Sequence, residues 1–128
     1  MDRLATAFEN EGQFAKALAL RSVEWPIIVE GVVWPPEAKI RCGVAFAEGL
    51  KRADKTSEAV NVLKDVHRIG TGNGCHIPEL YRGQRLLCEA FIEKDKHNEA
   101  EGTMRESWQH SLQCDAPRAV ITLSLIHI

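Results

Sequence analysis

Hydrophobic residues recur at helical spacing in three stretches of the chain, and a short polar turn interrupts each stretch. In residues 4–18, apolar side chains three or four positions apart lie on both sides of Gly12. Residues 46–60 and 87–101 repeat this arrangement around their own polar turns. Apolar residues at this spacing share one face of a helix, and Gly or Asp in a polar context favours a turn. The pattern therefore predicts three pairs of antiparallel helices.

The three stretches align with one another without a gap, at offsets of 42 and 41 residues. The aligned sets are Leu4, Phe46 and Leu87; Ala5, Ala47 and Cys88; Phe8, Leu50 and Phe91; and Ala17, Ala59 and Ala100. The second and fourth sets are small residues, which let two helices approach closely. Because a single helix pair is too thin to bury its own apolar face, the pairs are expected to stack on one another.

Proline and glycine mark the expected boundaries of the pairs. Pro36 and Pro78 each precede a glutamate and suit the first turn of a helix, whereas Gly70–Gly74 favours a stop. Pro26 interrupts the β-branched segment 24–36, which we expect to be an irregular connection with at most a short helical turn. The predicted pairs span about 2–24, 36–69 and 78–113, and a partial helix of a fourth pair begins at 117.

The repeated small and large residues around a Gly-Gln or Asp-Lys turn resemble the tetratricopeptide repeat, in a version with a period near 42 residues. The resemblance covers most of the chain and implies a right-handed α-solenoid that binds other proteins. The expected fold class is therefore all-α, with about three helix pairs and the start of a fourth in one domain, residues 1–122.

A narrower likeness covers residues 75–123. It resembles the C-terminal repeats of bacterial multidomain regulators, in which a DNA-binding or nucleotide-cyclase domain and a P-loop ATPase precede the repeats. The matching residues are Pro78, Glu79, Leu80, Arg82, Leu86, Leu87, Glu99, Ala100, Glu101, Arg118, Ala119, Thr122 and Leu123. The chain departs from that pattern at Gly83 and Gln84, where an apolar residue and a Lys-Gly pair are expected.

The last six residues, 123–128, read Leu-Ser-Leu-Ile-His-Ile. This is also the direct translation of the transposase recognition end used in sequencing-library preparation. We therefore expect the natural sequence to run only to about Thr122, and the chain to be a fragment. The alternative is a hydrophobic helix end.

Charge and composition narrow the classes of function. The chain has 16 Lys and Arg against 18 Asp and Glu, so its net charge of −2 offers no bulk attraction to nucleic acid. No apolar run approaches the ~20 residues of a membrane span, and the first residues do not open a signal peptide. We expect a cytoplasmic protein whose four cysteines (Cys42, Cys75, Cys88 and Cys114) are reduced and mostly buried.

The sequence contains no motif for a cofactor or for catalysis. Gly70–Gly74 lacks the preceding strand and the following Lys-Ser or Lys-Thr of a phosphate loop. His110 and Cys114 are four residues apart, but a structural zinc needs four converging ligands. No nucleophile turn pairs a thiol with an activating histidine, so we expect no enzyme activity, no metal and no cofactor. Trp108 is expected to pack in the core or between repeats, and Trp25 and Trp34 are expected to hold the irregular segment against the repeats.

The architecture itself indicates where a partner would bind. The first helix of each pair lines the concave side of such a stack. By helical position, this side includes Thr6, Arg41, Glu48, Arg52, Arg82, Arg85 and Glu89. Guanidinium groups pair well with carboxylates, so the four arginines are candidates for capturing acidic or C-terminal peptide groups. A solvated charged face without a ligand is the alternative.

Three hypotheses about function follow from the sequence. The first is a protein-interaction or scaffold module, the C-terminal sensor part of a larger bacterial regulator, whose partner is a protein, a peptide or another domain of the same chain. The second is a helical domain that senses a small effector. The third, and weakest, is a small helical hydrolase. None of them involves direct binding to nucleic acid or to a membrane.

Overall fold

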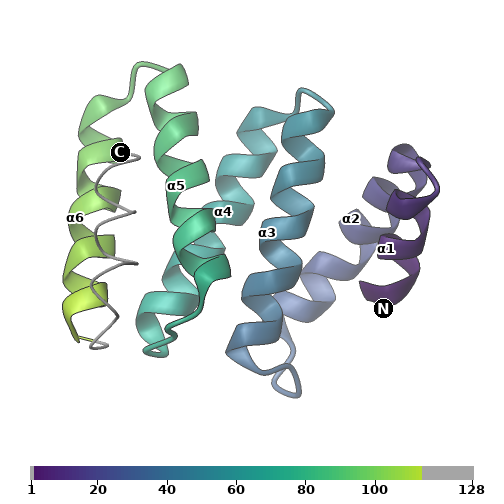
Figure 1. Cartoon of the computed structure of the whole chain (residues 1–128), viewed down its shortest axis with the longest axis horizontal. Coiled ribbons are helices and arrows are strands. Elements are labelled where there is room, and N and C mark those ends of the chain that lie inside the picture. Colours follow the sequence, from purple (N-terminus) through teal and green to yellow (C-terminus); the bar gives the residue numbers. More distant parts are fainter. Residues whose placement is uncertain (1, 114–128) are drawn as a thin grey trace.

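The computed structural model describes residues 2–113 and contains six α-helices, with no strand among those residues (Figure 1). The helices are α1 (Asp2–Asn10), α2 (Phe14–Glu30), α3 (Pro36–Arg52), α4 (Thr56–Gly72), α5 (Pro78–Glu93) and α6 (His97–Gln113). They follow one another along the long axis of the molecule, and α1, α3 and α5 lie nearer the viewer than α2 and α4 (Figure 1). The expectation of an all-α fold is confirmed. The predicted partial helix from 117 and the segment 123–128 lie outside the described residues.

The three turns inside the helix pairs share one backbone geometry. Gly12, Asp54 and Asp95 occupy aligned positions and have left-handed φ angles of 78°, 61° and 58°. In each turn the amide three residues past the helix end donates to the carbonyl five residues earlier, at 2.8 Å; the bonds join Gln13 to Phe8, Lys55 to Leu50 and Lys96 to Phe91. This is the 6→1 bond of a helix C-terminal motif, which satisfies a carbonyl that the helix leaves without a partner. The polar turns predicted from the sequence are therefore confirmed.

The aligned apolar positions form the core of the stack, apart from two residues in the first pair. Ten of the twelve are buried, namely Ala5, Ala17, Phe46, Ala47, Leu50, Ala59, Leu87, Cys88, Phe91 and Ala100. The exceptions are Leu4, which is 55% exposed, and Phe8, which is half-buried. Both belong to α1, which has described neighbours on one side only.

The second helix is longer than the sequence predicts, so the expected irregular connection over residues 24–36 is wrong for its first part. α2 continues through Pro26 to Glu30. Proline removes one helical hydrogen bond, to the carbonyl of Ser22, and Ser22 is exposed to water, which can supply a replacement. Burial compensates for the loss: Trp25 is 7% exposed and Ile28 is 2% exposed. Tertiary packing thus outweighs the local preference of the β-branched residues.

Two glycines allow the closest helix contacts around α3. A Cβ atom on Gly43 would come within 2.4 Å of Val66 Cγ2 in α4 and 2.8 Å of the Trp25 ring in α2. A Cβ atom on Gly83 in α5 would lie 3.0 Å from Val44 Cγ2 in α3. Gly83 is one of the two positions at which the chain departs from the pattern of the bacterial regulators. Its lack of a side chain is what brings α5 against α3.

The fourth helix, α4, ends three residues later than the sequence predicts. α4 runs to Gly72, and Gly70 is a buried helical residue. A Cβ atom at Gly70 would lie 2.3 Å from Leu80 Cδ1, so this glycine serves the contact between α4 and α5. Only Asn73 and the left-handed Gly74 (φ 65°) belong to the turn that follows.

The three tryptophans have different environments. Trp25 is buried, and its ring centroid lies 6.4 Å from that of Phe46. Trp34 is half-buried against the core, so both residues hold the α2–α3 connection as expected. Trp108 is 37% exposed, and Leu112 beside it on α6 is 55% exposed. Trp108 is therefore not a core residue, and the repeat expected to follow α6 lies outside the described residues.

Among residues 2–113, no helix is both long enough and apolar enough to cross a membrane.

The turn geometry leads to a stability prediction. Gly12→Ala should destabilise the protein by about 1 kcal/mol, because alanine resists a left-handed φ. No atom lies within 4 Å of the added methyl group, so backbone strain is the only cost. Gly102→Ala is the matched control: it also meets no atom within 4 Å but lies inside α6, where alanine should stabilise by about 1 kcal/mol. Thermal unfolding followed by circular dichroism measures both, and equal shifts of the two melting temperatures would contradict the assignment.

Candidate functional site

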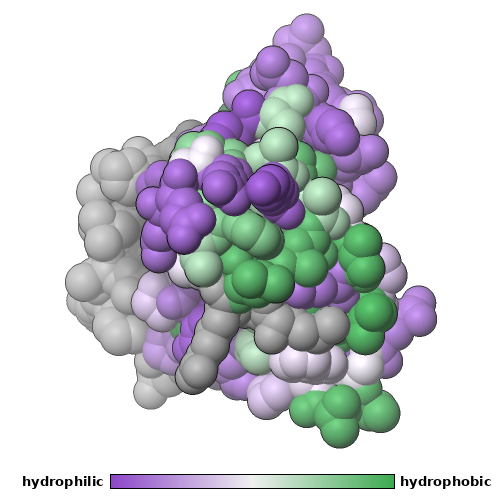
Figure 2. Space-filling model, turned by 90° about the vertical axis from the view of Figure 1, so that its right-hand side faces the viewer, coloured by the Kyte–Doolittle hydropathy of each residue, from purple (hydrophilic) through white to green (hydrophobic). Residues whose placement is uncertain are grey.

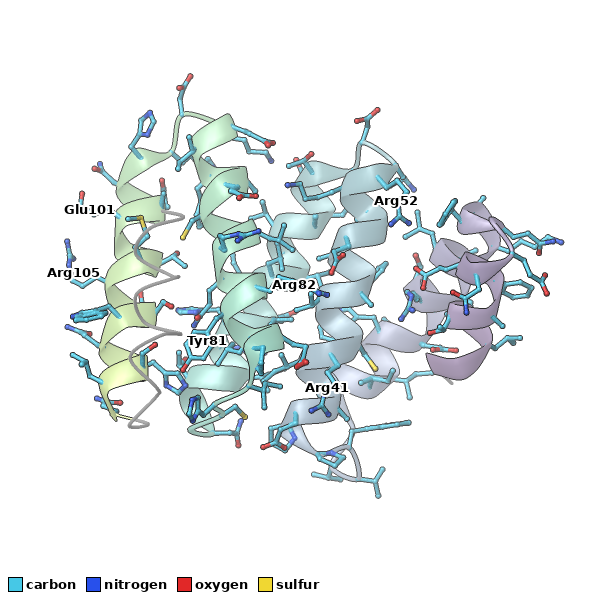
Figure 3. All side chains as sticks on the ribbon, viewed as in Figure 1. Arg41, Arg52, Tyr81, Arg82, Glu101 and Arg105 are labelled. Atoms are coloured by element: carbon cyan, nitrogen blue, oxygen red, sulfur yellow. The ribbon has the colours of Figure 1, made fainter. Side chains whose placement is uncertain are left out.

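The arginines predicted to capture a partner lie mostly on the face shared by α3 and α5, where they pair with carboxylates of the same face (Figure 3). Arg41 of α3 lies 3.6 Å from Glu79 of α5. Arg82 of α5 lies 2.5 Å from Glu48 of α3. These ion pairs link the first helices of neighbouring pairs.

Three further residues predicted to bind a partner lie elsewhere: two pair with each other within α5, and the third lies on α1. Arg85 and Glu89 form an i,i+4 pair along α5, at 3.6 Å. Thr6 is exposed on α1. The guanidinium groups of Arg41, Arg82 and Arg85 are thus already matched by glutamates, so the positive cluster that the sequence suggested is largely neutralised.

Arg52 differs from the other three arginines. It lies at the end of α3, and its guanidinium carbon is 4.4 Å from the centroid of the Phe14 ring at the start of α2. This cation–π contact holds the guanidinium over an aromatic face and leaves its edges available for hydrogen bonds. Arg52 therefore belongs to a different site from the one its sequence position suggested.

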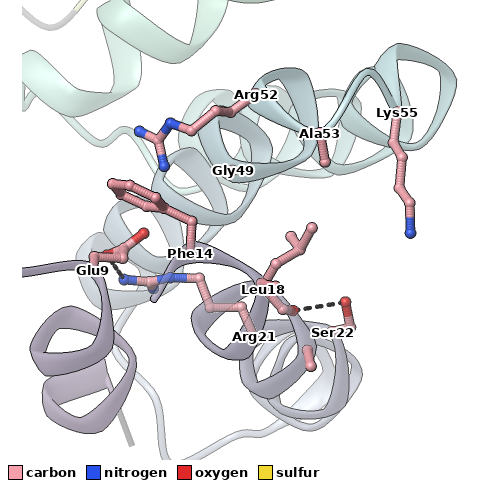
Figure 4. A pocket seen from close by; sticks show the side chains of 11 residues that line it. Glu9, Phe14, Leu18, Arg21, Ser22, Gly49, Arg52, Ala53 and Lys55 are labelled. Atoms are coloured by element: carbon pink, nitrogen blue, oxygen red, sulfur yellow. Dashed lines mark hydrogen bonds and ion pairs between the residues drawn. The ribbon is translucent and has the colours of Figure 1, made fainter. Parts of the chain in front are cut away.

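That site is a groove of about 550 Å³ between the first helix pair and α3 (Figure 4). Its apolar surface comes from one side of α2 and from the last turn of α3. The lining residues are Glu9, Phe14, Ala15, Leu18, Ala19, Arg21, Ser22, Gly49, Arg52, Ala53 and Lys55. Arg52 and Lys55 place two positive charges at its edge. The groove thus offers an apolar floor beside a cationic rim.

A buried ion pair supports the groove where α1 meets α2. Arg21 of α2 is 5% exposed, and its guanidinium donates to Glu9 of α1 at 2.9 Å (Figure 4). A buried charge is tolerated only when it is paired, so this contact fixes α1 against α2. Because Glu9 is committed to Arg21, it does not cancel the charges of Arg52 and Lys55.

The sequence reasoning missed most residues of this groove. Phe14 at the start of α2 is 45% exposed and stacks on Arg52, a contact that its place in the apolar pattern does not indicate. Gly49 also lines the groove, and a Cβ atom there would already touch Leu18 at 3.5 Å. The available signal was the alignment of Phe14 with Thr56 and His97, because a hydrophobic residue stands at this position only in the first pair.

Two histidines, His67 and His110, take part in polar contacts that link neighbouring elements. His67 of α4 receives a hydrogen bond at Nδ1 from the Gln84 amide at 3.0 Å and contacts Glu106 through Nε2 at 2.9 Å. Ser107 of α6 donates to the Gln84 carbonyl oxygen at 2.7 Å. Gln84, the second departure from the regulator pattern, therefore joins α4, α5 and α6 through one buried amide.

His110 is buried and bonds to the carbonyl of Cys75 through Nε2. Its predicted neighbour Cys114 lies outside the described residues. Among residues 2–113, no three His, Cys, Asp or Glu side chains gather in a group that could hold a metal ion.

The three described cysteines differ in burial, and Cys88 has the most perturbed thiol. Cys75 and Cys88 are buried and Cys42 is half-buried, as expected for these three. Burial, with a smaller contribution from the Glu89 carboxylate, raises the pKa of the Cys88 thiol to about 11. Its Sγ donates to the carbonyl of Ala100 at 3.7 Å. The thiolate is the reactive form, so Cys88 is inert near neutral pH.

Comparison with known proteins gave no match: no protein-family model, no curated protein and no solved structure is significantly similar to the chain.

The Cys88 environment predicts a pH dependence of stability. A thiol whose pKa rises on folding stabilises the folded protein. This stabilisation is fully present below the pKa of the unfolded state, 9.0, and is lost as the pH rises toward the folded-state pKa of about 11. Cys88→Ala removes that titration while restoring the residue found at the aligned positions Ala5 and Ala47. Urea unfolding at pH 8, 9, 10 and 11 should therefore show a smaller loss of stability in the variant. Parallel curves for the two proteins would refute the assignment.

Proposed function

We propose that this chain is an interaction module of the tetratricopeptide-like solenoid type, which binds a short peptide in the groove between its first helix pair and α3. The single observation that carries the proposal is the juxtaposition of an apolar floor with the cationic edge formed by Arg52 and Lys55. The repeated turns and the small residues at aligned positions support the solenoid assignment.

The groove favours a ligand with an apolar side chain next to a carboxylate. Phe14, Leu18 and Ala19 offer surface to an aliphatic group. Arg52 is held by the Phe14 ring in an orientation that exposes guanidinium edges, which can take a carboxylate in a bidentate pair. The arginine–glutamate pairs of α3 and α5 lack this combination, because their charges already balance.

The proposed setting of the module is a larger bacterial regulator in which these repeats contact a partner protein or another domain. The resemblance of residues 75–123 to such repeats supports this setting. Arg41 and Arg82 then contribute to the stacking of α3 and α5 rather than to capture of the peptide, and Arg85 forms an ion pair within α5.

A small effector is the second candidate ligand. The volume of about 550 Å³ falls within the range of about 300–1,000 Å³ that is usual for small-molecule sites. An anionic, partly apolar molecule would use the same floor and the same two cations. A thermal-shift screen of sugars and nucleotides addresses this candidate, because a ligand at 100 times its Kd stabilises the folded protein by about 3 kcal/mol.

Peptide binding can be tested with fluorescence anisotropy on labelled hexapeptides of leucine and glutamate that end in a free carboxylate. Arg52→Glu should weaken binding about tenfold or more, since it removes a charge-assisted pair and adds a repulsive charge. Arg82→Glu is the matched control, with the same charge change on the α3–α5 face and a side chain of comparable exposure. Circular dichroism should show unchanged helicity in both variants.

Two results would contradict the groove assignment. One is binding that Arg82→Glu weakens and Arg52→Glu does not, which would move the site to the α3–α5 face. The other is the absence of any peptide, sugar or nucleotide that binds with a Kd below about 1 mM.

A further inference from the structure

The face of α2 that points away from its neighbours α1 and α3 is unusually apolar for an exposed helix surface. Of the four charged residues of α2, Arg21 and Glu24 are buried, which leaves Lys16 and Glu30 as the exposed charges. Between them the exposed surface carries Val23, at 67% exposure, and Ile27, at 54%. Helices that are apolar on every side are normally covered by other structure.

The apolar surface continues beyond the helix. Val32 and Val33, in the connection that follows α2, are 100% and 87% exposed. Figure 2 shows this end of the molecule, where hydrophobic side chains gather in the middle, along the right-hand side and at the lower edge. Large exposed apolar side chains gathered at one end of a molecule are typical of an interaction site.

Five exposed residues of α2, namely Lys16, Ala19, Val23, Ile27 and Glu30, are arranged symmetrically about Val23. At 100° per residue, Lys16 and Glu30 lie about 20° to either side of Val23, and Ala19 and Ile27 lie about 40° to either side. Each of these pairs is also equidistant from Val23 along the helix axis, by seven and by four residues. A face with this symmetry can pack against a copy of itself across a twofold axis.

We propose that this face is a dimer interface, in which α2 packs antiparallel against α2 of a second copy with Val23 on the twofold axis. The arrangement places Lys16 opposite Glu30 of the second copy and repeats that ion pair by symmetry. It also places the small Ala19 opposite the large Ile27, so the two helices can approach closely. Parallel packing would instead set Lys16 against Lys16 and Glu30 against Glu30, which repels at both ends.

The size of the face sets the expected affinity. A helix of 17 residues is about 25 Å long, and the exposed valines of the connection extend the surface at one end. One such helix crossing lies at the small end of specific interfaces, so we expect a Kd on the order of 10 μM. The proposed dimer interface contains neither Arg52 nor Lys55, so it does not depend on the proposed peptide groove. Ala19 is the one residue of the interface that also lines the groove.

Sedimentation velocity on the whole chain, from about 1 to several hundred micromolar, tests the proposal. The unmodified protein should sediment as a monomer–dimer equilibrium. Val23→Asp should abolish the dimer, because it sets two carboxylates on the twofold axis. Each of Lys16→Glu and Glu30→Lys alone should weaken the dimer at least tenfold, since each replaces two attractive pairs with two repulsive ones.

Mixing the two charge variants gives the sharpest readout. The Lys16→Glu copy carries two negative charges on this face and the Glu30→Lys copy carries two positive charges, so an equimolar mixture should form a heterodimer where each variant alone is monomeric. All substituted residues are exposed, and unchanged circular dichroism will show that the fold is intact.

Two outcomes would overturn the proposal. A chain that stays monomeric throughout would show that the face is covered by something other than a second copy, such as a helix of another protein. A dimer that persists in Val23→Asp, or whose charge variants do not complement one another, would show that a different face associates.

Discussion

The structure depends on how closely α3 approaches the helices on either side of it. Gly43 leaves room for Val66 of α4 and for the ring of Trp25 of α2, and Gly83 brings α5 against Val44. Protein interiors are packed too densely to absorb an extra methyl group at such distances without displacement of a neighbour. A side chain at Gly43 would therefore push apart the first and second helix pairs at once.

The shape of the first pair follows from this contact. Because Trp25 fits against Gly43, α2 remains helical through Pro26 and reaches Glu30. The position of α2 in turn places Phe14 beneath Arg52 and opens the groove at the other end of the helix. The same placement turns Val23 and Ile27 outward. The proposed peptide site and the proposed dimer face are thus two consequences of one packing arrangement.

Periodicity and turn chemistry predicted the helix pairs well, because both are local properties. Gly12, Asp54 and Asp95 tolerate the left-handed backbone, and the small residues recur where helices cross. The helices that continue through Pro26 and Gly70 were not predicted, because their continuation depends on contacts between residues far apart in the sequence. Both residues read locally as helix breakers, and only the buried contacts of Trp25 and Leu80 reveal why the helices continue.

The candidate site was harder to predict from sequence. Arginine positions on a helix can be counted, but their partners on the next helix depend on the crossing of α3 and α5, which pairs Arg41 with Glu79 and Arg82 with Glu48. The alignment placed Arg52 with this group, whereas the ring of Phe14 draws it to the groove. A buried Gln84 linking three helices likewise has no local signature.

The most direct measurement is an amide NMR titration of the chain with a leucine–glutamate hexapeptide that ends in a free carboxylate. If the groove is the binding site, the shift changes will concentrate at Phe14, Leu18, Gly49 and Arg52, and they will vanish in Arg52→Glu. Changes concentrated at Arg41, Arg82 and Arg85, or the absence of any saturable change, would contradict it.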